Sequence, residues 1–422
     1  MPKVQRTNAQ ELLSFMSEYG RAYLQSGGPT SRLEEALSSL GRKFDHPSEV
    51  FATPTGIFTS CIDETGHTHT SLSRIKETGM NLGRLCWLEN IFEDVYSRKI
   101  TIAQANKILN SKVVQKSPYP FWQNVLAALV LGFSLSFSAF QSFTAAVASG
   151  LISMATWWIS GPGLKSQISS SIFRDFVGCT VTLGLAALFQ MLRPAPFEAY
   201  TIGGIIVLVP GLALTTAIAE LADQNLVSGT AKLMQAILTL LALGLAYMLF
   251  QELSASMGLM PAPSSGPRPV SILAGMAGVL VAVTCFGVLF KVPMKSLPWA
   301  ALTGVLGWLV LRSFSATPYY VSASYLASFT VGTVSLWIAN RYKVPSQLFS
   351  VPGILAMLPG MLALNSMRSF ALGHDASGLD LGVRVILTAG SIVFGLFTAR
   401  IPFALQFNPF KRMFRAAQGS NE

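Results

Sequence analysis

The feature that most constrains this chain is a series of long apolar segments that fills it from residue 121 to its C-terminal region. A helix that crosses a bilayer needs about 20 predominantly apolar residues. Ten segments meet that need, near residues 122–140, 143–159, 172–192, 199–218, 233–250, 270–290, 297–311, 319–338, 348–364 and 381–403. We therefore predict a mostly α-helical membrane protein with ten transmembrane helices.

The N-terminal region has a different character. Charged residues make up only 12% of the chain, about half of the share usual in soluble domains, and they are concentrated in the first 120 positions. Apolar residues recur at helical spacing over 9–25, 31–44, 80–96 and 103–112, and short β-like runs separated by turn residues lie within 49–72. These patterns predict a small α+β soluble domain ahead of the membrane part.

The boundaries follow from these changes in composition. We expect a cytoplasmic α+β domain at 1–118, a first five-helix half at 119–250, a Pro-, Ser- and Gly-rich linker at 251–269, a second five-helix half at 270–405 and a basic cytoplasmic tail at 406–422. Lys and Arg are commoner at the loop ends that share a side with the N-terminal domain, so both termini are expected to face the cytoplasm from the cell (inner) membrane.

A short motif occurs twice in the membrane part. Both copies read G-I-x4-P-G, one ending in Pro210-Gly211 and the other, 149 residues later, in Pro359-Gly360. Each lies in the fourth helix of its half. Since each half has an odd number of helices, the halves would have opposite orientations, which predicts a 5+5 inverted repeat. The alternative is a chance match, because Gly and Pro are frequent in membrane helices.

A Pro-Gly pair in the middle of a membrane helix interrupts its hydrogen bonds, and the helix ends that it frees bind ions or polar solutes in many transporters. The alternative is a kink that only shapes packing. Thr215, Glu220 and Asn365 follow the two motifs and are candidates for solute binding or proton coupling. A charge at Glu220 is costly unless it faces a cavity, or unless it lies at the cytoplasmic helix end in water. Hydroxyl and amide side chains also commonly join helices to each other.

The sequence lacks the signatures of several other functions. It has no G-x-S-x-G, H-E-x-x-H or G-x4-G-K-S/T motif, so neither a hydrolase elbow nor an ATP site is expected. Cys61, His67 and His69 suggest a metal cluster only superficially, because the histidines alternate on an edge strand. We expect no metal, no cofactor and, since the charge of +10 is scattered among apolar runs, no nucleic acid.

The N-terminal domain contains a Ser-Gly-Gly-x-Thr-x-Arg-x-Glu motif, which includes Thr30, Arg32 and Glu34, and a second characteristic run at 54–60. Further motifs follow at 209–211 (Val-Pro-Gly), at Glu220-Leu221 and at 228–232 (Ser-Gly-Thr-Ala-Lys). Together these motifs resemble the corresponding regions of the threonine/serine exporter family. The family usually has Asp at the position of Glu220 and often Arg at that of Lys232.

In the second half, the run from Val351 to Gly360 is similar to the family's companion domain. In some bacteria the two halves are separate proteins that together export succinate. The resemblance implies an exporter that moves threonine, serine or a dicarboxylate through the bilayer, driven by protons. The resemblance does not determine whether the chain forms a homo-oligomer.

We also hypothesise roles for the site residues. Glu220 would couple transport to protons and Thr215 would contact the solute, whereas Arg32 and Glu34, which share a motif with Thr30, would have structural or gating roles. Two other classes compete with this hypothesis. In one, the N-terminal domain is a hydrolase-like enzyme that the helices anchor, and in the other the chain is an ion channel or a sensor.

Overall fold

The computed structural model describes residues 8–76, 78–111, 117–258, 271–314 and 319–406. The chain divides into two compact units. The first comprises Met1–Asn124, Thr216–Leu238 and Gly287–Lys295, and the second comprises Val125–Thr215, Thr239–Phe286 and Ser296–Glu422. Most of the expected linker, 259–269, and all but the first residue of the expected tail, 407–422, lie outside the described residues.

The N-terminal part of the first unit is an α+β fold, as predicted. Its elements are α1 (Ala9–Gln25), α2 (Thr30–Lys43), β1 (Ser48–Thr53), β2 (Gly56–Ile62), β3 (Thr68–Arg74), α3 (Leu82–Tyr96) and α4 (Ile102–Leu109). The strands form an antiparallel sheet in the order β1-β2-β3. The turn residues at 54–55 and 63–67 connect the strands, which explains why three short strands form here rather than one helix.

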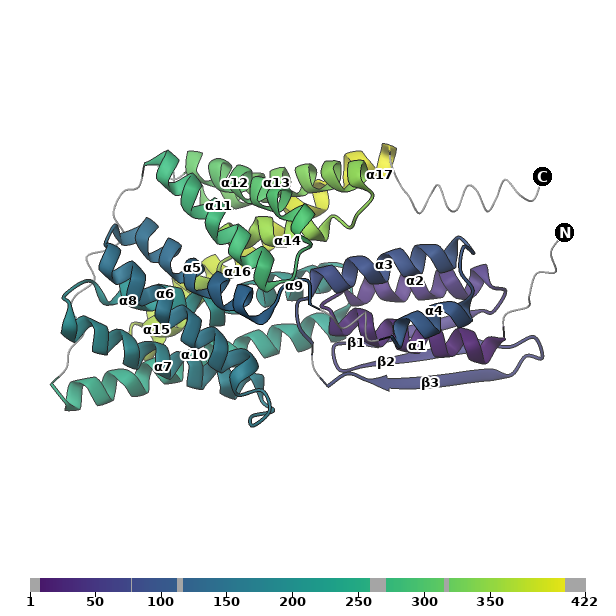
Figure 1. The fold of residues 1–422 in the computed structure, drawn as a ribbon, viewed down its shortest axis with the longest axis horizontal. Coiled ribbons are helices and arrows are strands. Elements are labelled where there is room, and N and C mark those ends of the chain that lie inside the picture. The colour runs from purple at the N-terminus through teal and green to yellow at the C-terminus, as the bar shows by residue number, and fades with distance from the viewer. Residues whose placement is uncertain (1–7, 77, 112–116, 259–270, 315–318, 407–422) are drawn as a thin grey trace. The chain divides into compact units, whose positions relative to one another are not determined.

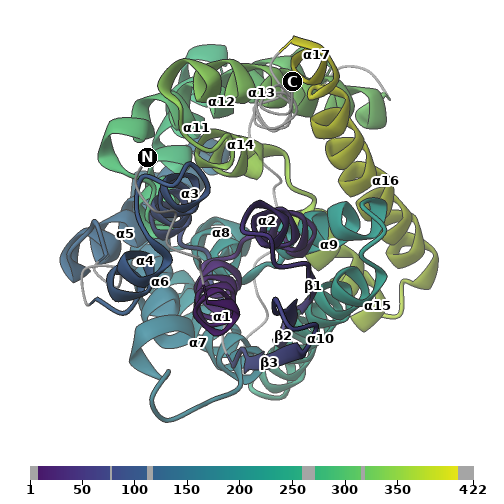
Figure 2. The same cartoon turned by 90° about the vertical axis from the view of Figure 1, so that its right-hand side faces the viewer.

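One face of this sheet is covered and the other is open. Helix α1 packs on β2 and β3 while α2 packs on β1 (Figures 1 and 2). Ile57 of β2 points into the resulting core and is fully buried. On the open face, Phe51, Phe58 and Leu72 stand in register across the three strands, and each is at least half exposed. The alternation of the strands therefore places one apolar row inside and a second one on the surface.

The remaining helices include every candidate membrane span. They are α5 (Phe121–Phe140), α6 (Phe143–Trp158), α7 (Ser171–Leu192), α8 (Phe197–Leu208), α9 (Gly211–Ala222), α10 (Leu226–Ser256), α11 (Ile272–Leu289), α12 (Leu297–Ser313), α13 (Tyr320–Tyr342), α14 (Gln347–Ile354), α15 (Gly360–Ala371), α16 (Asp375–Thr398) and α17 (Ile401–Gln406). Within the described residues, 10 helical segments are long and apolar enough to cross a membrane. The predicted number of spans is confirmed.

Two of these segments are interrupted at the Pro-Gly motifs. The fourth span, Phe197–Ala222, consists of α8 and α9, and the ninth, Gln347–Phe370, contains α14, a 3-10 turn at Leu355–Met357 and α15. Helix α10 continues to Ser256, so the first six residues of the expected linker, 251–256, are helical. Residues 251–256 contain no helix breaker, and the first left-handed glycine after them is Gly258, with φ of +69°.

Small residues allow the helices of the second unit to approach closely. A Cβ atom on Gly203 of α8 would lie 2.6 Å from the Cα of Gly132 on α5 and 2.6 Å from the Oγ of Ser149 on α6. The Gly203 amide also donates a hydrogen bond to that Oγ, at 3.1 Å. Glycine and serine bring three backbones together here, as is common between membrane helices.

This contact gives a first prediction. In Gly203→Ala the new methyl group overlaps backbone and must displace α5 or α6, which we expect to cost about 1–3 kcal/mol, typical of overpacked cores. The thermal unfolding midpoint of the full-length protein in detergent should therefore fall. Gly184→Ala on α7 is the matched control, since a Cβ there meets nothing within 4 Å. Equal midpoints for Gly203→Ala and the wild type would contradict the packing argument.

Candidate functional site

The first compact unit buries a carboxylate that accepts hydrogen bonds from three polar groups. Glu220, on α9, is only 3% exposed. The Thr30 amide donates to its Oε1 at 3.1 Å, the Thr30 hydroxyl donates to its Oε2 at 2.5 Å, and the Lys232 ammonium donates to Oε1 at 2.6 Å. We call Thr30, Glu220 and Lys232 the carboxylate cluster. It joins the N-terminal domain to residues that follow the first Pro-Gly motif.

Glu220 acts as the N-terminal cap of α2. The residue at the cap position is Pro29, which makes no capping hydrogen bond through its side chain. The first amides of a helix lack partners within the helix and carry a partial positive charge, so an anion at this position is stabilising. Here the anion comes from another part of the chain. Asp223, one turn further along, lies 3.5 Å from the Ser31 hydroxyl and adds a second carboxylate nearby.

Two glycines after α1 explain why Thr30 faces Glu220. Gly27 has φ of +86°, a left-handed conformation that ends α1, and the Gly28 amide donates back to Tyr23. A Cβ on Gly28 would lie 2.1 Å from the Tyr23 ring, so the chain passes directly over that ring. The Ser-Gly-Gly-x-Thr motif thus forms the reversal that starts α2 at Thr30.

A second glycine contact positions Lys232. Helices α9 and α10 form a tight hairpin, with Gln224 at φ of +62° in its turn. A Cβ on Gly229 would meet the Leu221 side chain at 2.6 Å and the Leu221 amide nitrogen at 2.9 Å. The close approach that glycine permits lets Lys232 reach back to Glu220. The Ser-Gly-Thr-Ala-Lys run therefore supplies the cation of the carboxylate cluster.

Strand β1 connects both sides of the cluster. The Ala52 carbonyl accepts from the Ser228 hydroxyl at 3.2 Å, and the Ala52 amide donates to Glu34 Oε1 at 2.6 Å. Burial raises the pKa of Glu34, the Ala52 hydrogen bond opposes this rise, and the negative charge of Glu220 adds to it. Glu34 is thus anchored to the sheet and lies close enough to the cluster to respond to its charge.

Arg32 makes a different contact. Its guanidinium lies 3.3 Å from Glu89 Oε1 on α3, which links α2 to α3. Burial raises the pKa of Glu89, and the Arg32 charge opposes that rise. Of the three residues expected in the N-terminal motif, only Thr30 binds Glu220 directly, whereas Arg32 and Glu34 tie α2 to its neighbours.

Tyr23 lies beside these groups and was not a candidate from the sequence. It is 2% exposed, and its hydroxyl has no hydrogen-bond partner within the part of the chain that the structure describes. Burial raises its pKa strongly, Arg32 opposes the rise, and the carboxylates of Glu89 and Glu220 add to it. No sequence signal identifies Tyr23, because its contact with Gly28 is visible only in the structure.

A loop from the second half of the chain also belongs to this unit. The amide of Leu82, at the start of α3, donates to the Phe290 carbonyl at 2.9 Å, and the Tyr119 hydroxyl donates to the Val292 carbonyl at 2.5 Å. A Cβ on Gly83 would lie 2.6 Å from the Lys291 carbonyl oxygen. The N-terminal domain thus contacts residues 290–291 as well as α9 and α10.

The two Pro-Gly motifs meet each other in the second unit. Val209 and Leu358 are extended, and α9 and α15 begin directly after the prolines, at Gly211 and Gly360. A Cβ on Gly211 would lie 3.3 Å from both the Cα and the amide nitrogen of Gly360, and one on Gly360 would lie 2.6 Å from Val209 Cγ1. The N-terminal ends of two half-helices, each with a partial positive charge, are therefore neighbours.

The remaining candidates have weaker connections to this meeting point. Thr215 is buried, and its hydroxyl donates to the Gly211 carbonyl at 3.1 Å, within α9. Asn365 is exposed on α15, while the next residue, Ser366, is buried and donates to the Gly378 carbonyl at 2.7 Å. The structure brings Pro210, Gly211, Pro359 and Gly360 together and leaves Asn365 on the surface of its helix.

Cys61 and His69 are two of the residues that the sequence superficially suggests as a metal cluster. His69 contacts Asp63 at 2.9 Å, and burial raises the pKa of Cys61, which disfavours the thiolate. Burial also raises the pKa of Cys86 to about 11. No group of three or more His, Cys, Asp or Glu side chains suited to a metal ion occurs among the described residues.

Comparison with known proteins agrees with this architecture. The family model described as "Putative threonine/serine exporter" matches residues 14–253, and the one described as "Threonine/Serine exporter, ThrE" matches residues 275–401. No solved structure matches the chain.

The curated relatives span bacteria and fungi. A Mycobacterium tuberculosis protein, "Probable threonine/serine exporter", is 21% identical over 93% of this chain and 77% of its own length. "Pheromone-regulated membrane protein 10" is 23% identical in Kluyveromyces lactis, over 92% of this chain, and 24% identical in Eremothecium gossypii, over 54% of it. The chain spans only 43% and 32% of these two fungal proteins. The expected resemblance is confirmed, and the chain belongs to the threonine/serine exporter family.

Proposed function

We propose that this integral membrane protein is a secondary transporter that exports threonine, serine or a similar small carboxylate. The proposal rests mainly on the meeting of the α9 and α15 N-terminal ends at Gly211 and Gly360. Two partial positive charges held side by side repel each other, and in a membrane little solvent screens them. A bound carboxylate group would relieve that repulsion, as substrate carboxylates do at discontinuous helices in other transporters.

This chemistry and the names of the relatives support the proposed substrate class. Threonine and serine each carry one carboxylate, and the bacterial relative is named as a probable exporter of these two amino acids. The same helix ends would also bind one carboxylate of succinate. Dicarboxylate export is therefore the second candidate, and it shares the proposed site.

We propose that Glu220 couples transport to protons. Its carboxylate caps α2 through Thr30 and pairs with Lys232, while Tyr23, Glu34 and Asp223 are the other titratable groups nearby. Protonation would remove the negative charge that both the helix end and the ammonium group stabilise. Contacts between the N-terminal domain and α9–α10 would then weaken, which makes the domain a gate.

This gate would act on both halves. The N-terminal domain contacts α10 through Ala52 and the segment 287–295 through Leu82. Tyr119, just after the domain, also contacts that segment. We propose that it faces the cytoplasm together with both termini of this chain, and that the two five-helix halves are an inverted repeat that alternates access around the Pro-Gly motifs. The proposed orientation agrees with the distribution of Lys and Arg, and the proposed location is the cell membrane.

The first test is export from cells that lack their own exporters. Cells that express this chain are loaded with threonine- or serine-containing dipeptides, and efflux of the amino acid is followed with and without a protonophore. We expect efflux that the protonophore suppresses. Efflux of succinate alone would favour the second candidate, and efflux that ignores the protonophore would indicate a channel. Hydrolysis by the full-length protein without any transport would favour the hydrolase alternative.

A second test addresses coupling. Glu220→Gln keeps the shape and some hydrogen bonds of the side chain but cannot lose a proton, so protonophore-sensitive export should fall at least tenfold while surface expression stays near wild type. Asp223→Asn is the matched control, because it removes a neighbouring carboxylate that accepts no hydrogen bond from the Thr30 amide of α2. Wild-type, proton-dependent export by Glu220→Gln would exclude the coupling role.

A third test addresses the substrate site. In the double variant Pro210→Ala/Pro359→Ala, amide donors return and the half-helices can become continuous, which removes the two free N-terminal ends. A helix terminus contributes up to about 2 kcal/mol to anion binding, so KM for export should rise up to about 30-fold. Pro196→Ala, at the start of α8, is the control for loss of a proline in the same span. Unchanged KM in the double variant would exclude this site.

A further inference from the structure

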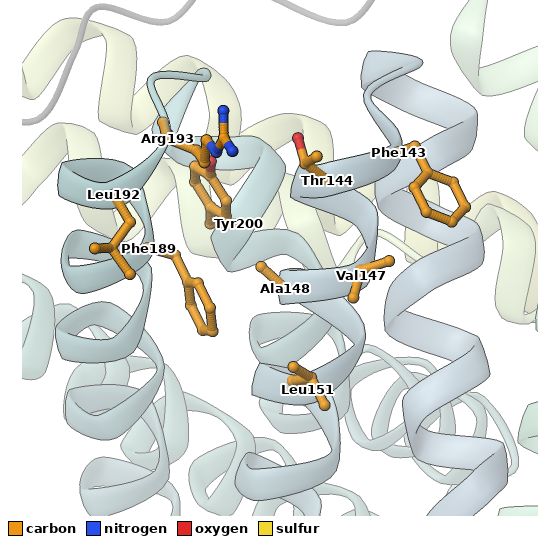
Figure 3. Close-up of a pocket in the computed structure, with 9 residues that line it drawn as sticks. All are labelled: Phe143, Thr144, Val147, Ala148, Leu151, Phe189, Leu192, Arg193 and Tyr200. Carbon is orange, nitrogen blue, oxygen red and sulfur yellow. The ribbon is translucent and has the colours of Figure 1, made fainter.

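A groove in the second unit lies away from the Pro-Gly motifs. It has a volume of about 440 Å³ and is formed by α6, the end of α7 and the start of α8. Phe143, Val147 and Leu151 line it from α6, and Phe189 and Tyr200 line it from α7 and α8. Figure 3 shows Leu151 at one end of this lining and Arg193 at the other.

The groove begins at an end of the membrane-spanning helices. Arg193 follows directly after α7, and Phe143 is the first residue of α6. Leu151 is eight positions after Phe143, so the groove extends about 12 Å along α6, less than half of the hydrocarbon thickness. Phe143 and Val147 are 66% and 41% exposed, although the lining is apolar. In a bilayer such a surface contacts acyl chains.

Arg193 gives the mouth of this groove a fixed positive charge. Its amide donates to the Phe189 carbonyl at 2.9 Å, and its carbonyl accepts from the Tyr200 hydroxyl at 2.7 Å, so its backbone is held on both sides. Among the described residues, no carboxylate pairs with its guanidinium. Glu198, five residues later, instead lies 3.5 Å from Arg368. An exposed arginine above an apolar groove suits a molecule with an anionic head and an apolar tail.

We propose that this groove binds one anionic phospholipid, with an acyl chain between α6 and α7 and the phosphate on Arg193. Guanidinium groups bind phosphate through two parallel hydrogen bonds, so Arg193 is suited to hold the phosphate of an anionic headgroup. The charge selects an anionic lipid over a zwitterionic one. The alternative occupant is a second copy of the chain, which would have to place a carboxylate against the Arg193 guanidinium.

Native mass spectrometry of the full-length protein tests the proposal. The protein is titrated in detergent with phosphatidylglycerol or phosphatidylcholine, and the first bound lipid is measured. We expect a preference for phosphatidylglycerol that Arg193→Gln reduces about fivefold, the effect of one basic residue near a membrane surface. Arg193→Lys should retain most of the preference. Arg312→Gln, at the end of α12, is the matched control and should retain all of it.

A second variant separates the groove from the charge. Val147→Trp fills the groove and leaves Arg193 in place, so it should weaken binding of both lipids. The proposal is overturned if wild type binds both lipids equally, if Arg193→Gln behaves like Arg312→Gln, or if Val147→Trp leaves lipid binding unchanged. A dimer without lipid that Val147→Trp dissociates would also overturn it, because a second copy would then occupy the groove.

Discussion

A buried carboxylate at the end of a helix organises the first compact unit. Removing Glu220 from water is costly, and the cost is offset only because the α2 N-terminus and the Lys232 ammonium surround it. Those two partners come from different parts of the chain. Their arrangement requires the glycine reversal at 27–28 and the glycine contact at 229. The Glu220 carboxylate therefore gives a common explanation for the glycines at 27, 28 and 229.

The same arrangement relates the N-terminal domain to transport. A helix cap formed by its own residues would have made α2 independent of the membrane helices. Instead, Pro29 makes no capping bond, and the cap belongs to α9. Because α9 also begins at Gly211, one helix carries both the proposed coupling residue and one of the two converging helix ends. Glu220 and the helix end at Gly211 are therefore connected through the backbone of a single helix.

The sequence predicted the elements of this protein better than their contacts. Ten spans and an α+β domain follow from hydropathy and periodicity, which act within about 20 residues. The interruptions at Pro210 and Pro359 were predictable for the same reason. The bond between Thr30 and Glu220 joins residues 190 positions apart, and no local pattern encodes it. The pairing of Arg32 with Glu89 was likewise not predicted, because helix periodicity does not identify which helix lies opposite. The sequence left the Thr215 hydroxyl open between solute and helix contacts, and the structure places it on a carbonyl of its own helix.

The length of helix α10 has a mechanical consequence. It is unbroken for 31 residues and is thus about 46 Å long, whereas the hydrocarbon layer is about 30 Å thick. When a straight helix rotates about its middle, the displacement of each residue grows with its distance from the pivot. Near one end α10 carries Ser228 and Lys232, which bind Ala52 and Glu220. A tilt too small to disturb packing in the middle of α10 would be amplified at that end, where a displacement of a few ångströms is enough to break a hydrogen bond.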